Sequence, residues 1–243
     1  MGRGKIMKKK IITCILSTTL LIPAVAHAEE TKATQNNANA SKLTNASIAS
    51  QKQGWVQERG YWYYYDKNGN RVTGWLNDGG KWYYLYDYSG IMQTGWLSIK
   101  DKKTGVTSWY YFDPNTGVMQ TGWVKVNGYW YFLNNNGVRQ TGWLNNGGKW
   151  YYLGTYGQME TGRTSVDNVY YYFDKNSGAM QTGWIQEYGS WYYYNNNGAQ
   201  HKGWLQLGGS WYYLDSYSGY MRTGWALIDN QWYQFNSNGV WIG

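Results

Sequence analysis

From residue 54 onward, short aromatic and aliphatic runs alternate with turns rich in glycine and asparagine. Residues 122–133 show the unit. Two runs of high β-propensity flank Asn127-Gly128, which is the strongest short-range signal for a β-hairpin. A second turn at residues 134–137 leads to the next Thr-Gly-Trp. Each unit therefore predicts one hairpin and a connector, and we expect the units to stack because a lone hairpin is marginal in water.

This unit recurs nine times along the chain. Gly-Trp dipeptides recur every 20 or 21 residues with two exceptions: residues 101–105 are inserted in the third repeat, and Arg163 replaces the tryptophan of the sixth. The first tryptophans are Trp55, Trp75, Trp96, Trp123, Trp143, Trp184, Trp204 and Trp225. The second aromatic residues are Trp62, Trp82, Trp109, Trp130, Trp150, Tyr170, Trp191, Trp211 and Trp232. A fixed period of this length predicts a solenoid.

Strand alternation sorts the rings of each repeat into two faces. In residues 62–65, Trp62 and Tyr64 point to one face, and Tyr63 and Tyr65 point to the other. The position of Tyr65 holds leucine or phenylalanine in most other repeats, which is typical of a core. We therefore expect the face of Tyr63 and Tyr65 to pack inside and the face of Trp62 and Tyr64 to bind a ligand.

The composition indicates the chemistry of that ligand. The chain has 17 Trp and 27 Tyr beside only four Phe, so its rings have an apolar body and a polar edge. The face of such a ring attracts cations, and several rings around one point suit a quaternary ammonium group. Many weak sites on one chain would bind a polymer strongly through avidity.

The motif Thr-Gly-Trp-x7-Tyr-Tyr-Leu, with Gly-x-Met-x-Thr before the next Gly-Trp, resembles the choline-binding repeats of cell-wall proteins from pneumococci and related Gram-positive bacteria. The resemblance covers residues 54–243. It implies an all-β fold, a left-handed β-solenoid of about nine stacked hairpins. It also implies attachment to phosphocholine on teichoic and lipoteichoic acids. The choline sites would lie between consecutive hairpins, with Trp and Tyr from both and a Met nearby.

Carried onto this sequence, the resemblance implies a series of aromatic cages, although the sequence leaves open which neighbour supplies each ring. The groups would be Trp55, Trp62 and Tyr84; Trp75, Trp82, Met92 and Tyr111; Trp96, Trp109 and Met119; Trp123, Trp130 and Tyr152; Trp184, Trp191 and Tyr213; and Trp204, Trp211 and Met221. Trp143, Trp150, Trp225 and Trp232 hold equivalent positions. The methionine is replaced by Arg71, Arg139, Gln200 or Trp241 in four repeats. Because Arg163 takes the place of a cage wall, we expect a dead site in the sixth repeat.

Two other kinds of binding protein share part of this pattern. Glucan-binding repeats have the same hairpins and rings, and aromatic rings also stack on sugars; displacement by free choline would distinguish the two. A surface regulator or adhesin could use the insertion at residues 100–104 to bind another protein. Catalysis finds no support in the sequence, because beyond residue 28 there is no cysteine and one histidine, His201, and the carboxylates are scattered over turns. We expect no cofactor and no metal.

The amino-terminal segment predicts export. Five basic residues, an apolar stretch from residue 11 to residue 22 and Ala26-His27-Ala28 form the pattern of a signal peptide over residues 1–28. Residues 29–53 are polar, contain no aromatic residue and predict a flexible linker. Beyond residue 28 the chain has 17 Lys and Arg against 14 Asp and Glu, which gives no electrostatic basis for nucleic-acid binding.

Overall fold

The computed structural model describes residues 52–243, which form eighteen β-strands and no helix. The predicted signal peptide and the predicted linker up to residue 51 lie outside the described residues. Nothing in the described part of the chain is a helix that could cross a membrane. Each strand pairs with the next in an antiparallel two-stranded sheet, which gives nine hairpins. The prediction of an all-β chain of nine hairpin repeats is confirmed.

We number the repeats 1 to 9 by these hairpins. Repeats 1 to 3 are β1 (Gly54–Glu58) with β2 (Tyr61–Tyr65), β3 (Gly74–Asp78) with β4 (Lys81–Leu85), and β5 (Gly95–Lys100) with β6 (Thr107–Phe112). Repeats 4 to 6 are β7 (Gly122–Val126) with β8 (Tyr129–Leu133), β9 (Gly142–Asn146) with β10 (Lys149–Leu153), and β11 (Gly162–Val166) with β12 (Val169–Phe173). Repeats 7 to 9 are β13 (Gly183–Glu187) with β14 (Ser190–Tyr194), β15 (Gly203–Leu207) with β16 (Ser210–Leu214), and β17 (Gly224–Ile228) with β18 (Gln231–Phe235).

A two-residue turn closes each short hairpin. In repeat 4 the turn residues Asn127 and Gly128 have φ values of 50° and 87°, so both lie in the left-handed region. That geometry matches the right-handed twist of the two strands, and asparagine and glycine adopt it most readily. The turn fixes the register, in which Trp123 lies opposite Phe132 and Lys125 opposite Trp130.

Backbone hydrogen bonds join each repeat to the one before it. The amide of Met119, in the connector after repeat 3, donates to the carbonyl of Trp82 in repeat 2 at 2.8 Å. Met119 also forms an antiparallel bridge with Phe112 of its own repeat. Residues in the same position do so from repeat 2 to repeat 9, so the connector fixes how each hairpin sits on the preceding one.

Every hairpin contributes the side chain of one equivalent position to the core. These residues hold the last position of each second strand and are at most 8% exposed: Tyr65, Leu85, Phe112, Leu133, Leu153, Phe173, Tyr194, Leu214 and Phe235. The prediction that this position forms the core is confirmed. Burial of a large apolar side chain stabilises by about 1.5–3 kcal/mol, so this single file contributes stability in every repeat.

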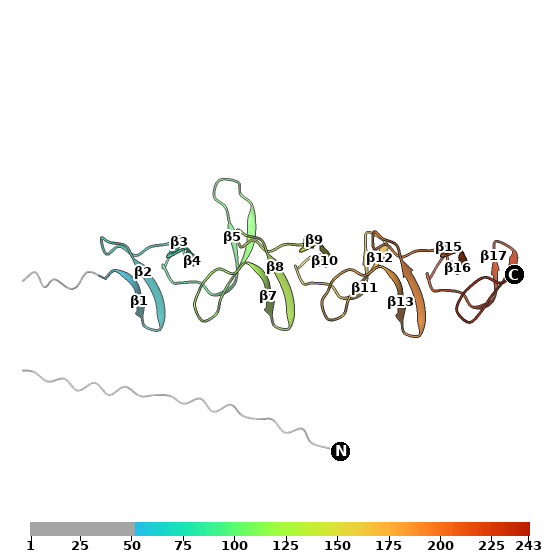
Figure 1. Cartoon of the computed structure of the whole chain (residues 1–243). Helices are drawn as coiled ribbons and strands as arrows, with labels where there is room; N and C mark the ends of the chain where they lie inside the picture. Colours follow the sequence, from blue (N-terminus) through green and yellow to red (C-terminus); the bar gives the residue numbers. More distant parts are fainter. Residues whose placement is uncertain (1–51) are drawn as a thin grey trace, which may run out of the picture. The chain divides into compact units, whose positions relative to one another are not determined.

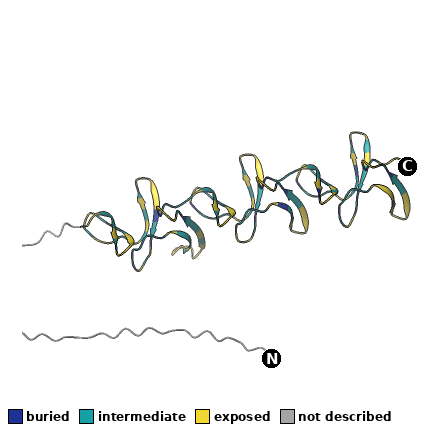
Figure 2. Ribbon diagram, turned by 90° about the horizontal axis from the view of Figure 1, so that it is seen from below, coloured by how far each residue is buried: buried dark blue, intermediate teal, exposed yellow. Residues whose placement is uncertain are grey.

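The direction of the hairpins recurs every three repeats. In Figure 1 the hairpins of repeats 1, 4 and 7 point one way, and those of repeats 3, 6 and 9 point another. The turn ends of the hairpins extend away from the chain of buried residues and are mostly exposed (Figure 2). The first tryptophan of a hairpin, such as Trp75, lies near its base, and the second, such as Trp82, lies close to its turn.

Candidate functional site

The aromatic side chains gather into hollows between consecutive hairpins. Trp75 and Trp82, from the two strands of repeat 2, stand edge to face with ring centroids 6.2 Å apart. Tyr110 of repeat 3 approaches Trp75 at 4.9 Å. The resulting hollow of about 390 Å³ is lined by Trp75, Trp82, Tyr110, Met119, Asn135 and Asn136.

The same construction is found five repeats further along. Trp184 of repeat 7 lies 5.1 Å from Tyr212 of repeat 8. The hollow of about 300 Å³ is lined by Trp184, Trp191, Tyr212, Met221, Ser237 and Asn238. Three successive repeats thus contribute: two tryptophans from the first, a tyrosine and the connector methionine from the second, and two turn residues from the third.

We number each cage by the repeat that supplies its first two residues. Cross-repeat ring contacts of 4.7–5.1 Å and the connector hydrogen bonds assign the walls. Cages 1 to 4 are Trp55, Trp62, Tyr83 and Met92; Trp75, Trp82, Tyr110 and Met119; Trp96, Trp109, Tyr131 and Arg139; and Trp123, Trp130, Tyr151 and Met159. Cages 5, 7 and 8 are Trp143, Trp150, Tyr171 and Met180; Trp184, Trp191, Tyr212 and Met221; and Trp204, Trp211, Tyr233 and Trp241.

The tyrosine wall is not the one that the sequence suggested. Tyr83, and not Tyr84, approaches Trp55, at 4.7 Å. Tyr84 packs on Trp75 of its own hairpin at 5.2 Å, and its hydroxyl donates to Asp87. Tyr111, Tyr152 and Tyr213 likewise pack on the first tryptophan of their own hairpins. The structure therefore brings a tyrosine of the expected core face to the preceding tryptophan, whereas the tyrosines of the expected binding face pack on a tryptophan of their own hairpin.

The methionines differ from the sequence prediction by a whole repeat, whereas the tyrosines differ by one residue within the predicted repeat. Met92 belongs with Trp62, Met119 with Trp82 and Met221 with Trp191, since each methionine amide donates to the carbonyl of that tryptophan. The sequence had grouped each of them with the following tryptophan pair. The two tryptophans of each predicted pair do lie in the same cage, because both belong to one hairpin.

The pair of repeat 9 has no partner hairpin among the described residues. Trp225 is 64% exposed and Trp232 is 61% exposed, against 38% and 44% for Trp75 and Trp82 of cage 2. The tryptophans of this pair are thus less buried than those of cage 2, which are covered by the tyrosine and the methionine of a following repeat.

The cage walls carry no negative charge of their own. Burial raises the pKa of Tyr83, and the nearby carboxylate of Asp78 raises it further, so this phenol stays neutral well above neutral pH. Asp78 also accepts a hydrogen bond from the indole nitrogen of Trp55 at 2.9 Å, which holds that ring in place from the next hairpin. Such a site attracts a cation through the faces of its rings and not through a salt bridge.

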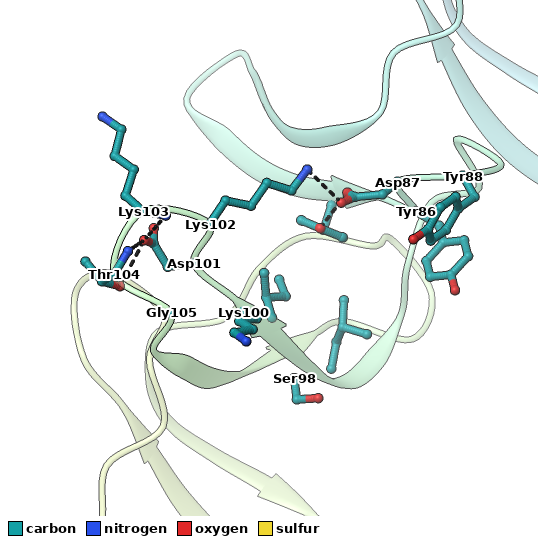
Figure 3. Close-up of a pocket in the computed structure, with 13 residues that line it drawn as sticks. Tyr86, Asp87, Tyr88, Ser98, Lys100, Asp101, Lys102, Lys103, Thr104 and Gly105 are labelled. Carbon is teal, nitrogen blue, oxygen red and sulfur yellow. Dashed lines mark hydrogen bonds and ion pairs between the residues drawn. The ribbon is translucent and has the colours of Figure 1, made fainter.

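A larger hollow lies beside the long β5–β6 hairpin of repeat 3. The insertion at residues 101–105 lines this hollow together with Tyr84. Lys102 of the insertion forms an ion pair with Asp87 at 3.2 Å (Figure 3). The hydrogen bond from Tyr84 and the charge of Lys102 lower the pKa of Asp87. This hollow is lined by the inserted loop, by residues 97–100 of β5 and by Tyr84, Tyr86 and Tyr88, and no tryptophan lines it.

Side chains that could bind a metal ion do not gather in the described part of the chain. Residues 52–243 contain no cluster of three or more histidine, cysteine or carboxylate side chains that could hold a metal. The ring nitrogens of His201 contact the side chain of Asn195 and the carbonyl of Trp204, so this histidine joins its connector to the next hairpin.

The sequence model of the choline-binding repeat matches residues 72–121, 120–159 and 181–223, which together exceed half of the chain. The chain belongs to the choline-binding repeat family. A second family model, of a cell wall binding repeat, matches residues 53–70 and 223–240. No curated protein matches in a sequence comparison.

Solved structures with choline-binding repeats resemble the chain. The choline-binding domain of CbpL from Streptococcus pneumoniae is 30% identical, with a TM-score of 0.56 over 79% of this chain and 98% of that one. CbpJ from the same organism is 30% identical over 79% and 88% of the two chains, with a TM-score of 0.44. Choline binding protein F, also from that organism, is 28% identical over 79% and 87%, with a TM-score of 0.46.

Proposed function

We propose that this protein binds choline groups of cell-surface polymers, in particular phosphocholine on teichoic and lipoteichoic acids, and that it catalyses no reaction. The observation that carries the proposal is the regular series of cages between consecutive hairpins. Each complete cage offers three aromatic rings from two hairpins and closes with the residue of the connector. The family to which the repeats belong supports the same ligand.

The strength of one cage follows from its rings. Each ring contributes about 0.5–1 kcal/mol to the binding of a cation at an exposed site and about 2 kcal/mol at a desolvated one. Three rings that are buried to different extents therefore give about 4 kcal/mol, a dissociation constant on the order of 1 mM. Such a site is too weak to hold the protein on a wall by itself. A polymer that carries many choline groups engages several cages at once and is held by avidity.

The same proposal includes the place of action. The amino-terminal 28 residues have the pattern of a signal peptide, and the repeats would then retain the exported protein on choline-bearing polymers without a covalent link. Open aromatic hollows also suit sugars, so a glucan is the alternative ligand that an experiment has to exclude.

Affinity chromatography on choline-substituted resin tests the proposal. We expect the full chain to be retained and to elute with free choline at millimolar concentrations or above, since free choline competes at each weak site. Soluble α-glucan should release none of it. Retention that choline does not affect but soluble glucan abolishes would overturn the proposal in favour of sugar binding.

A further inference from the structure

Cage 3 already contains a cation. The guanidinium carbon of Arg139 lies 5.8 Å from the ring centroid of Trp96 and 5.4 Å from that of Trp109, the two tryptophans of the cage. Tyr131 closes the third side, 4.8 Å from Trp96. A side chain that starts at the methionine position thus places its charge against the rings that a bound ammonium group would contact.

Cage 6, in which Arg163, Tyr170, Tyr192 and Gln200 hold the four wall positions, contains a cation as well, and here it comes from the position of the first tryptophan. The guanidinium carbon of Arg163 lies 4.1 Å from the ring centroid of Tyr170 and 4.8 Å from that of Tyr192. Its Nη2 donates to the side chain of Gln200 at 3.0 Å and to the carbonyl of Ser218 at 3.2 Å. Arg163 occupies the position of the first tryptophan, and it fills the space between the two remaining rings.

No carboxylate explains either position. Among residues 52–243, neither Arg139 nor Arg163 forms an ion pair, and the Nε atom of each is buried without a hydrogen-bond partner. Burial lowers the pKa of Arg139, but arginine stays charged in proteins because its ordinary pKa is so high. Aromatic rings compensate the charge of Arg139, and at Arg163 they do so together with the oxygens of Gln200 and Ser218. The ring contacts are of the kind that would bind choline.

We propose that Arg139 and Arg163 are resident cations that occupy cages 3 and 6 in place of choline, so that these two cages are closed to ligand. The inference rests on the proposed function, because it treats the rings as cation sites. A tethered cation is present at high effective concentration, whereas free choline binds one cage at about millimolar strength. The tethered group therefore wins the competition.

The closed cages are three repeats apart, which gives them a common direction. Hairpins three repeats apart point the same way (Figure 1), and we infer that cages 3 and 6, which start from two such hairpins, face the same side. The incomplete tryptophan pair of repeat 9 belongs to that series too. Cages 1, 4 and 7 and cages 2, 5 and 8 form the other two series and stay open. The choline polymer is thereby confined to two of three sides, and the third side, from which the long hairpin of repeat 3 projects, is left free of it.

Methionine methyl groups give one signal for each cage. The five methionines of the described chain, Met92, Met119, Met159, Met180 and Met221, close cages 1, 2, 4, 5 and 7. In protein with ¹³C-labelled methionine methyls, choline should shift all five signals. Arg139→Met should add a methyl signal that also shifts with choline, with a midpoint within about threefold of the native five, since five other cages already have methionine there.

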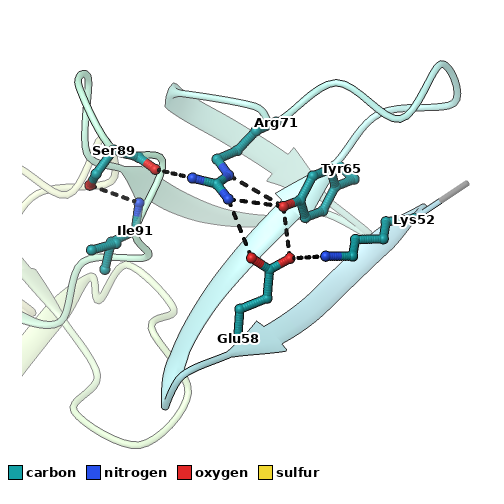
Figure 4. A network of polar contacts seen from close by, with 6 residues as sticks. All are labelled: Lys52, Glu58, Tyr65, Arg71, Ser89 and Ile91. Carbon is teal, nitrogen blue, oxygen red and sulfur yellow. Dashed lines mark hydrogen bonds and ion pairs between the residues drawn. The ribbon is translucent and has the colours of Figure 1, made fainter. Parts of the chain in front are cut away.

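Arg71 supplies the matched control. It holds the same position after repeat 1, but the 53 residues before that repeat contain no aromatic residue, so no tryptophan pair precedes it. Its guanidinium lies over Tyr63 and bonds Glu58, the hydroxyl of Tyr65 and the carbonyl of Ser89 (Figure 4). Arg71→Met should add a methyl signal that choline leaves unmoved. If the methyl introduced at position 139 is equally insensitive, the inference is overturned.

Cage 6 provides an independent test. Gln200→Met places a reporter there while Arg163 remains, and we expect no response to choline. Gln200→Met combined with Arg163→Trp restores the missing wall, and the same reporter should then shift. A response in the single variant would contradict the inference.

The wild-type chain can also be examined directly. In crystals soaked with arsenocholine, whose arsenic scatters anomalously, peaks should appear in cages 1, 2, 4, 5, 7 and 8 and not in cages 3 and 6. A peak in either closed cage, with its arginine displaced, would overturn the inference and leave the proposed function intact. Failure of all five native methionine signals to respond would instead refute the proposed function itself.

Discussion

Replacing Tyr212 by leucine removes one wall of cage 7 without disturbing the tryptophan pair. Tyr212 comes from the following hairpin and lies 5.1 Å from Trp184. Tyr193 lies almost as close to the same tryptophan, at 5.2 Å, but belongs to the same hairpin and does not line the hollow. The two tyrosines therefore make similar ring contacts and differ in whether they face the ligand.

The expected effects differ accordingly. Loss of one half-exposed ring from a cation site costs about 1–2 kcal/mol, which weakens binding at that site roughly 5- to 30-fold. Tyr212→Leu should raise the choline midpoint of the Met221 methyl signal by that factor and leave the signals of Met92 and Met119 unchanged. Tyr193→Leu should change the Met221 midpoint by less than about twofold, because it removes packing and no cage wall.

The methyl titration reads cage 7 separately from the other cages, which an overall binding isotherm cannot do. Far-ultraviolet circular dichroism of both variants checks that the hairpins remain. If Tyr193→Leu weakened the Met221 response as much as Tyr212→Leu does, the assignment of walls to neighbouring hairpins would be refuted. The tyrosine predicted from the sequence alone, Tyr213, provides a third comparison, and its replacement by leucine should leave cage 7 intact.

Three further results are expected. Ala at both Trp184 and Trp191 should abolish the choline response of Met221 and remove one bound arsenocholine, while Met119 still responds. Gly178→Ala should lower the thermal midpoint more than Gly183→Ala does and should shift the Met159 signal without ligand. Both glycines have positive φ, 71° and 81°, but a Cβ at Gly178 would overlap the Met159 side chain, whereas one at Gly183 meets open space. Burial alone would raise the pKa of Asp215, but hydrogen bonds from Ser218 and Arg222 and the charge of Arg222 lower this pKa to about 2. The carboxylate therefore stabilises the fold fully above the ordinary pKa of 3.8, and this stabilisation is lost as the pH falls through about 2. Thermal unfolding between pH 4 and pH 2 should therefore show a smaller loss for Asp215→Asn than for wild type.

Local signals in the sequence determined the hairpins, their number and their core. Turn pairs such as Asn127-Gly128 specify a hairpin because few residues adopt positive φ readily, and the strand period of two then places Leu133 opposite Gly122 and inside. The pairing of Trp75 with Trp82 was also accessible, since both belong to one hairpin of known register. These features depend on contacts within a single hairpin, whose turn and strands can be read from neighbouring residues in the sequence.

Only the tertiary structure decided which neighbour completes each cage. The rotation between consecutive hairpins is set by connector hydrogen bonds, such as that from Met119 to Trp82, and no local pattern encodes it. That rotation brings Tyr110, rather than Tyr111, to Trp75. It also determines where a long side chain ends: the sequence shows Arg139 at a methionine position, but the packing of two hairpins places its charge between Trp96 and Trp109.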